Sequence, residues 1–124
     1  MKGNSFHKRN SFLYSFVYAL RGIVWVTATQ RNMRIHLAAA VAVLAAAVWL
    51  GLSNAETAVI VLAVALVMVA EIINTAIERA VDLVTREYHP LAGIAKDVAA
   101  GAVLLAAFFS VVIGALVFLP HIIK

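Results

Sequence analysis

Three carboxylates and a carboxamide recur along one segment of the sequence at spacings that place them on one face of a helix. Glu71 is followed by Asn74, Thr75, Glu78 and Asp82, at offsets of three, four, seven and eleven residues. At about 100° per residue, these five positions fall within an arc of about 100°. Carboxylates on a low-dielectric face repel one another, so they need protons, basic partners or a bound cation. Oxygen donors in this pattern suit Mg²⁺, which takes one or two carboxylates together with phosphate oxygens and water.

Glu71 is the most unusual of these residues because it lies inside an apolar segment. It is eight residues before Arg79, which places it roughly 12 Å deep if the helix is regular. An acidic side chain at that depth costs on the order of 2 to 3 kcal/mol. A structural polar contact with a neighbouring helix is the plain alternative to a functional role. For Asp82 taken alone, a solvated helix end is the favoured interpretation.

Lys96 and Asp97 come directly before the last apolar segment, at the same depth in the membrane interface as Glu78. A lysine there can neutralise the charge of a transferring phosphoryl group. The alternative is an interfacial anchor whose ammonium extends to the lipid headgroups. The sequence has no GxxxxGK[ST] motif, which excludes a P-loop nucleotide site, and no Cys, which excludes disulfides and thiolate sites.

Three segments must position these residues, and each is long enough to cross a bilayer: 35–52, 57–77 and 98–119. The second is a span only if Glu71 is accepted inside it. From about 5 to 31, apolar residues at helical spacing alternate with basic ones, which is typical of a helix in the headgroup plane or packed on the bundle. We predict an all-α integral membrane protein in which 1–124 form one domain, with three transmembrane helices and an N-terminal amphipathic surface helix.

Composition and charge agree with a membrane protein. Of the 124 residues, 65% are hydrophobic and 13% are charged, against about half and a quarter in a soluble domain, which excludes a soluble enzyme. In a membrane protein, the net charge of +4 indicates membrane topology and contact with anionic headgroups. We therefore expect no nucleic-acid partner. Nine of the ten Lys and Arg lie before the first span or between the second and third. We therefore predict a cytoplasmic N-terminus and an external C-terminus.

Two stretches resemble the signature of a known family. EIINTAIERAVDLV (71–84) and EYHPLAGIAKDVAAGAVLL (87–105) are similar to the small integral-membrane diacylglycerol kinase and undecaprenol kinase family of prokaryotes. The similarity covers most of the chain, from SFVYALRG through RNMRIH to the end. The HPLA and KDVAAGAV details are more similar to the undecaprenol kinases of Gram-positive bacteria than to the diacylglycerol kinases of Gram-negative bacteria.

The resemblance implies an ATP-dependent, Mg²⁺-using lipid kinase of the bacterial cell membrane that assembles as a homotrimer. Glu71 matches the catalytic base that takes the proton from the lipid hydroxyl, and Glu78 matches the carboxylate that holds the cation bridging the ATP phosphates. The resemblance assigns several further positions to the nucleotide site: Tyr18, Asn74, Glu87, Tyr88, His89, Lys96 and Asp97.

Two positions depart from the family's pattern. Gln30 stands where the family usually has a glutamate that serves as a second metal ligand. Its carboxamide oxygen can coordinate a cation but adds no negative charge, so cation affinity should fall. Ser11 stands where a basic residue commonly precedes the Phe-Leu pair. Either departure could mark weaker activity, altered metal use or a sister activity.

Several functions remain open at this point. The leading hypothesis is phosphorylation of undecaprenol, with diacylglycerol as the nearest alternative. Another alternative is a weakened kinase homologue that binds lipid, and the observation in its favour is Gln30. A small proton-coupled transporter would explain Glu71, but not the gathering of Glu78, Lys96 and Asp97 at one interface. Because three helices enclose little volume, we expect an oligomer to be needed to shield Glu71 from lipid.

Overall fold

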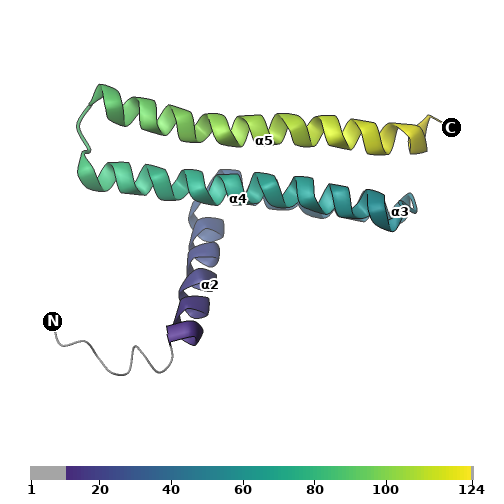
Figure 1. Ribbon diagram of the computed structural model, residues 1–124, viewed down its shortest axis with the longest axis horizontal. Coiled ribbons are helices and arrows are strands. Elements are labelled where there is room, and N and C mark those ends of the chain that lie inside the picture. The colour runs from purple at the N-terminus through teal and green to yellow at the C-terminus, as the bar shows by residue number, and fades with distance from the viewer. Residues whose placement is uncertain (1–10, 124) are drawn as a thin grey trace.

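The computed structural model describes residues 11–123, and all the regular structure within them is helical (Figure 1). The helices are α2 (Ser11–Thr29), α3 (Arg31–Trp49), α4 (Asn54–Val84) and α5 (Pro90–Ile122). Each is long and apolar enough, by length and composition, to cross a membrane. The all-α class predicted from the sequence is confirmed. Residues 5–10 of the predicted surface helix lie outside the described residues.

Helix α4 is the centre of the structure. Helices α3 and α5 both pack along it, and the three run antiparallel in succession (Figure 1). Helix α2 packs on both α3 and α4, and it runs across the direction of the other three helices. Within the described part of the chain, α3 and α5 scarcely pack on one another, so α4 forms the floor of a groove between them.

Helices α4 and α5 are longer than a bilayer requires. They have 31 and 33 residues, against 19 in α3. At 1.5 Å per residue these lengths are about 46, 50 and 28 Å, compared with about 30 Å of hydrocarbon. The extra length extends past the predicted spans 57–77 and 98–119 mostly where α4 leads into α5. This projecting end carries the polar residues that follow Glu71.

The turn between α3 and α4 explains why one long apolar stretch forms two helices. Gly51 has φ of 68°, a left-handed conformation that costs glycine little. Its amide donates to the Val48 carbonyl over 3.1 Å, and the Leu52 amide donates to the Ala47 carbonyl over 3.0 Å, which is the Schellman arrangement. Ser53 and Glu56 then form a reciprocal capping box that starts α4.

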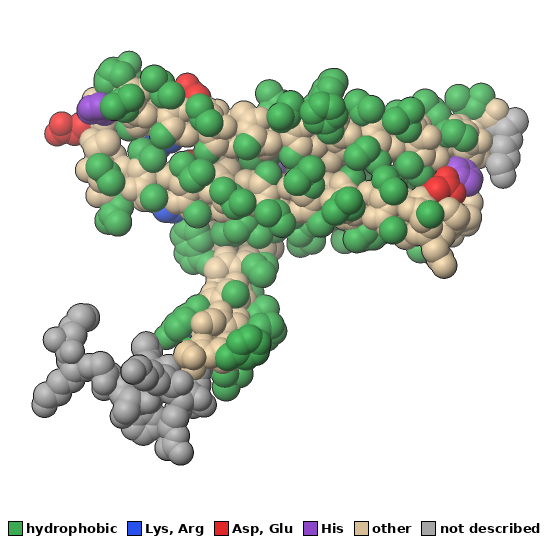
Figure 2. Space-filling view, viewed as in Figure 1, with side chains coloured by type: hydrophobic (Ala, Val, Ile, Leu, Met, Phe, Trp, Pro, Cys, Tyr) green, Lys and Arg blue, Asp and Glu red, His purple; other side chains and the backbone are tan. Residues whose placement is uncertain are grey.

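The surface of the bundle suits hydrocarbon. Figure 2 shows hydrophobic side chains along the whole length of the α3–α5 body, with charged and His side chains gathered at its two ends. Large apolar side chains such as Leu62, Leu104 and Val111 are exposed. In water such a surface would be a large exposed apolar patch, whereas in a bilayer it faces lipid. The chain is a membrane protein.

Candidate active site

Glu71 is buried within a single chain. Its residue is 2% exposed, and it lines a cavity of about 300 Å³ together with Asn32 of α3 and Ala100 of α5. The expectation that an oligomer is needed to shield it is wrong. Because α3 and α5 flank α4 at this level, the two neighbouring helices of the same chain cover the carboxylate.

The carboxylate of Glu71 is held loosely. Among the described residues its Oε2 has no hydrogen-bond partner, and the basic group that faces it, Nε2 of His36 on α3, lies 3.7 Å away. That separation is longer than a hydrogen bond. Thr75 Oγ1 instead donates to the main-chain carbonyl of Glu71 over 3.0 Å, which leaves the carboxylate untouched. A buried carboxylate oxygen without a donor is costly, and it is suited to receive a hydroxyl group from a ligand.

Asn74 and Glu78 form the next level of the site. Asn74 Nδ2 donates to Glu78 Oε1 over 3.2 Å. The other amide atom of Asn74, Oδ1, is buried and has no partner in the part of the chain that the structure describes, and Asn74 lines the same cavity as Glu71. The predicted helix face is therefore present. Its inner members Glu71, Asn74 and Thr75 are buried, and its outer members Glu78 and Asp82 are half-buried.

Lys96 is paired with Asp82 rather than with Glu78. Its Nζ donates to Asp82 Oδ1 over 2.6 Å, which joins the projecting ends of α4 and α5. Asp82 lies near the end of α4 and its side chain is still 36% exposed beside Lys96, which agrees with its interpretation as a solvated helix end. Asp82 lies four residues beyond Glu78, or about 6 Å along the helix, and outside the span 57–77. The hydrogen bond from Lys96 holds the pKa of the Asp82 carboxyl below its ordinary value.

Residues of α2 and its junction with α3 lie apart from this cluster. Tyr18 is exposed, its ring stacks on that of Tyr14 with centroids 6.3 Å apart, and the Arg21 guanidinium lies 5.7 Å from its centroid. Gln30 separates the two helices, and its Nε2 donates to Thr29 Oγ1 over 3.4 Å. This leaves the carboxamide oxygen of Gln30 as the atom that could face a cation.

The connection between α4 and α5 holds the remaining predicted residues. His89 Nδ1 accepts a hydrogen bond from the Leu91 amide over 3.1 Å and caps α5. The Glu87 carbonyl accepts one from the Thr85 hydroxyl over 3.3 Å, and Tyr88 is 93% exposed. Asp97 is also exposed. The structure brings Glu71, Asn74 and Glu78 together, and within the described range no hydrogen bond or ion pair joins the other predicted residues to this group.

Sequence reasoning missed three side chains that organise the site. His36 faces Glu71 from α3. Arg34 Nη1 donates to the carbonyls of Thr27 and Ala28 over 3.3 and 2.8 Å, which caps the end of α2. Arg79 places its guanidinium 5.4 Å from the centroid of the Trp25 ring and ties α2 to α4. A polar residue just inside an apolar run was the only signal for His36.

The donors of the cluster fit a divalent cation that arrives with a nucleotide. Among the described residues, no group of three or more His, Asp and Glu could hold a metal by itself. Asn74 and Glu78 do supply oxygen atoms, one of them buried and unpartnered. Mg²⁺ commonly takes one or two such protein oxygens and completes its shell with phosphate oxygens and water.

Comparison with known proteins decides the family. Residues 17–118 match the sequence model of the family described as "Prokaryotic diacylglycerol kinase". The chain belongs to the prokaryotic diacylglycerol kinase family. This membership confirms the prediction of a membrane lipid kinase and gives no support to the transporter alternative.

Relatives within this diacylglycerol kinase family carry two names. An undecaprenol kinase from Bacillus subtilis (strain 168) is 50% identical over 114 residues, which are 91% of this chain and 92% of the relative. A diacylglycerol kinase from Synechocystis sp. is 47% identical over 125 residues, covering 100% of this chain and 71% of the relative. The diacylglycerol kinase of Escherichia coli (strain K12) is 40% identical over 84 residues, 65% of this chain and 69% of its own.

Proposed function

We propose that the chain transfers the γ-phosphoryl group of ATP to undecaprenol at the cytoplasmic face of the membrane. The relative named undecaprenol kinase supports this substrate, because its 50% identity extends over almost the full length of both chains. Diacylglycerol is the nearest alternative, since other relatives are named for it. The observation that carries the proposal is the buried Glu71 carboxylate, whose Oε2 has no donor within residues 11–123, in a cavity that Asn74 also lines.

Glu71 acts as the general base. The lipid hydroxyl oxygen forms a bond to the γ-phosphorus while the bond from that phosphorus to the bridging oxygen of ADP breaks. The hydroxyl proton passes to Glu71. Phosphoryl transfer asks a protein mainly for positioning and charge neutralisation, and a carboxylate with an unsatisfied oxygen can accept the hydroxyl without first losing another contact.

Glu78 and Lys96 prepare the phosphate side of the site. Glu78 lies seven residues from Glu71 on α4, or about 10 Å along the axis, and Asn74 fixes one of its oxygens. Glu78 and the Gln30 oxygen would hold Mg²⁺, which neutralises phosphate charge when bound. Lys96 is fixed by Asp82 through one N–H, and its other two N–H groups remain for phosphate oxygens.

We assign the remaining nucleotide contacts to α2, to the connection between α4 and α5, and to the first turns of α5. Tyr18 on α2 would lie beside the adenine. Glu87, Tyr88 and His89, in the connection from α4 to α5, and Asp97 in the third turn of α5 would contact the nucleotide. The capped start of α5, where His89 accepts from the Leu91 amide, gives this connection a fixed geometry.

The proposed arrangement in the membrane has three spans and one surface helix. Helices α3, α4 and α5 cross the bilayer, and α2 lies in the headgroup plane because it runs across their direction. The distribution of Lys and Arg favours a cytoplasmic N-terminus and an external C-terminus in a bacterial cell membrane. One domain, 1–124, assembles as a homotrimer, a state that follows the family resemblance.

A panel of lipid alcohols tests the function. The purified chain in micelles is given ATP, Mg²⁺ and each of undecaprenol, diacylglycerol and a simple long-chain alcohol, and phosphorylated lipid is measured. The proposal expects the highest kcat/KM for undecaprenol. A preference for diacylglycerol would transfer the proposal to the alternative substrate, and no product from any alcohol would remove it.

A weakened kinase homologue that binds lipid is the second candidate. The observation in its favour is that a neutral carboxamide occupies position 30 and its nitrogen is engaged with Thr29 Oγ1. The Gln30→Glu variant separates the two. A large gain in turnover at low Mg²⁺ favours the weakened homologue, whereas an unchanged rate favours the active kinase.

A further inference from the structure

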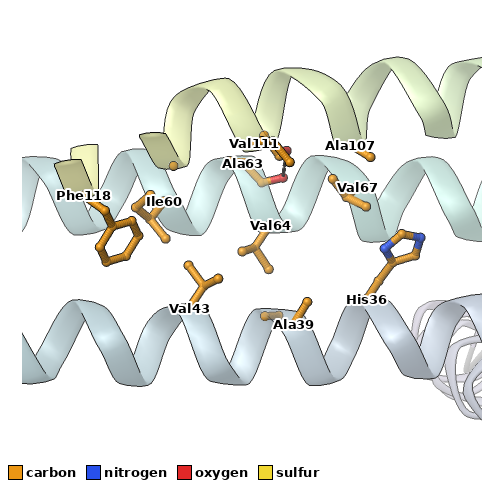
Figure 3. Close-up of a pocket in the computed structure, with 13 residues that line it drawn as sticks. His36, Ala39, Val43, Ile60, Ala63, Val64, Val67, Ala107, Val111 and Phe118 are labelled. Carbon is orange, nitrogen blue, oxygen red and sulfur yellow. Dashed lines mark hydrogen bonds between the residues drawn. The ribbon is translucent and has the colours of Figure 1, made fainter. Parts of the chain in front are cut away.

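A second cavity lies deeper in the bundle than the one that holds Glu71. It has a volume of about 280 Å³ and fills the groove between α3 and α5, with α4 as its floor (Figure 3). Small apolar side chains line most of it, among them Ala39, Ala63 and Val64. His36 and Phe118 stand at its opposite ends.

His36 connects the two cavities. It lines the deep apolar cavity and also the cavity that contains Glu71 and Asn74, and Ala107 of α5 is the other residue that lines both. The two spaces are therefore adjacent at the level of His36. One of them is apolar along its length, and the other holds the buried polar atoms that have no partners.

Of the polar side chains that line the deep cavity, His36 is the one that remains available to a ligand. Among the described residues that line it, His36 and Ser110 have polar side chains, and Ser110 Oγ donates to the Ala63 carbonyl over 3.0 Å. The imidazole of His36 stands at the boundary with its Nε2 3.7 Å from Glu71 Oε2. A small approach would bring these two atoms within hydrogen-bond distance.

We infer that His36 is a positioning residue that orients the Glu71 carboxylate, and that the deep cavity takes the part of the lipid alcohol's single hydrocarbon chain that lies next to the hydroxyl. This inference rests on the proposed function. When an apolar chain occupies the deep cavity, the hydroxyl at its end lies beside His36, where the two cavities meet, and next to Glu71. The volume is just below the range for ligand pockets, which suits the first part of one chain rather than of two. His36 thus sets both the depth of the hydroxyl and the direction of the base.

Substitutions at His36 test the positioning role. The His36→Ala variant should lower kcat/KM for the lipid alcohol between about 10- and 100-fold, because a misplaced base costs turnover. The KM for ATP should stay unchanged. His36→Gln, which keeps an N–H donor, should recover most of the loss. His121→Gln, at the far end of the bundle, is the control and should behave as the parent. Parent-like kinetics for His36→Ala, or equal defects in the Ala and Gln variants, would overturn the role.

Glycine substitutions test the chain cavity. Gly114 lines it, and a Cβ added there meets no atom within 4 Å among the described residues, so Gly114→Leu places a side chain in the cavity without a clash at its first atom. Gly101→Leu is the matched control, because its added Cβ also meets nothing and it lines neither cavity. Gly114→Leu should raise the KM for the lipid alcohol at least about tenfold relative to Gly101→Leu. Equal KM values in the two variants would overturn the assignment of the cavity.

A spectroscopic measurement separates this inference from the proposed function. In histidine side-chain ¹⁵N spectra, Glu71→Gln should shift the resonances of His36 and leave those of His121 in place. This result is expected whether or not the chain phosphorylates any lipid, because it reports only the contact between two side chains. Unmoved His36 resonances would overturn the positioning role, whereas absence of turnover in the parent protein would overturn the proposed function instead.

Discussion

Asn74 Nδ2 and Glu78 Oε1 are joined by a hydrogen bond of 3.2 Å across one turn of α4. Asn74 is 7% exposed, and its amide oxygen has no partner among the residues that the structure describes. Asn74 thus fixes the Glu78 carboxylate through its nitrogen and offers its own oxygen to the cavity that Glu71 lines. The site is organised largely by α4 itself, which explains why its outline could be predicted from the spacing of residues on one helix.

The Asn74→Ala variant should weaken the use of Mg²⁺. Without the amide donor, Glu78 loses its orientation, and the site loses one buried oxygen. We expect a higher Mg²⁺ concentration for half-maximal rate and a turnover reduced by about 10- to 100-fold. Titration of activity with Mg²⁺ measures both. Asn54→Ala, at the exposed start of the same helix, is the control, and an identical Mg²⁺ titration for Asn74→Ala and Asn54→Ala would contradict the role of Asn74.

The Arg79→Gln variant should loosen α2. The guanidinium lies 5.4 Å from the Trp25 ring centroid, a contact worth about 0.5 to 1 kcal/mol at an exposed site. Its loss should change the emission of Trp25, which can be recorded alone in a Trp49→Phe background because Trp49 is 84% exposed at the far end of α3. Arg86→Gln serves as the control. Emission that is unchanged in Arg79→Gln would show that the contact does not hold α2.

The ion pair between Lys96 and Asp82 should make the projecting end sensitive to acid. The hydrogen bond from Lys96 lowers the folded pKa of Asp82, so the pair stabilises the fold fully above the ordinary aspartate pKa of about 3.9. That contribution is lost as the pH falls through the lowered folded pKa. Thermal unfolding in detergent between pH 7 and pH 3 should show a smaller loss of Tm for Asp82→Asn than for the parent. Equal losses would contradict the linkage.

The Gly51→Ala variant should destabilise the turn between α3 and α4. With φ of 68°, an alanine there costs about 1 to 2 kcal/mol, although no atom obstructs its Cβ. Gly22→Ala is the matched control, because that helical position is also unobstructed and alanine is favoured in a helix by about 0.5 to 1 kcal/mol. Thermal unfolding should place Gly51→Ala below the parent and Gly22→Ala at or above it. A Gly51→Ala variant as stable as the parent would contradict the strained turn.

Periodicity alone predicted the parts of the structure that depend on a single helix. The three long apolar segments became α3, α4 and α5, and the face that begins at Glu71 is turned inward along α4. Helix ends were less predictable. Helices α4 and α5 continue beyond the apolar segments, because the polar residues that flank these segments also favour helix. The Schellman turn at Gly51 depends on one backbone conformation that the apolar pattern does not encode.

Contacts between helices were not predictable in the same way. The pairing of Lys96 with Asp82, the approach of His36 to Glu71, and the burial of Glu71 by its own chain all depend on how α3 and α5 pack on α4. Lys96 and Asp82 are 14 residues apart in the sequence, and His36 and Glu71 are 35 apart. Their contacts can be recognised only once the packing of the helices is known. A spacing rule for one helix carries no information about its neighbours.

The most direct test of the central claim compares Glu71→Gln with Glu56→Gln in a lipid kinase assay. Both replace a carboxylate of α4, but Glu56 lies at the opposite end, where it pairs with His121 over 2.8 Å. The account predicts that Glu71→Gln loses turnover by at least about 100-fold while its oligomeric state and Tm stay those of the parent, and that Glu56→Gln remains active. Turnover by Glu71→Gln at the parent rate would contradict the account.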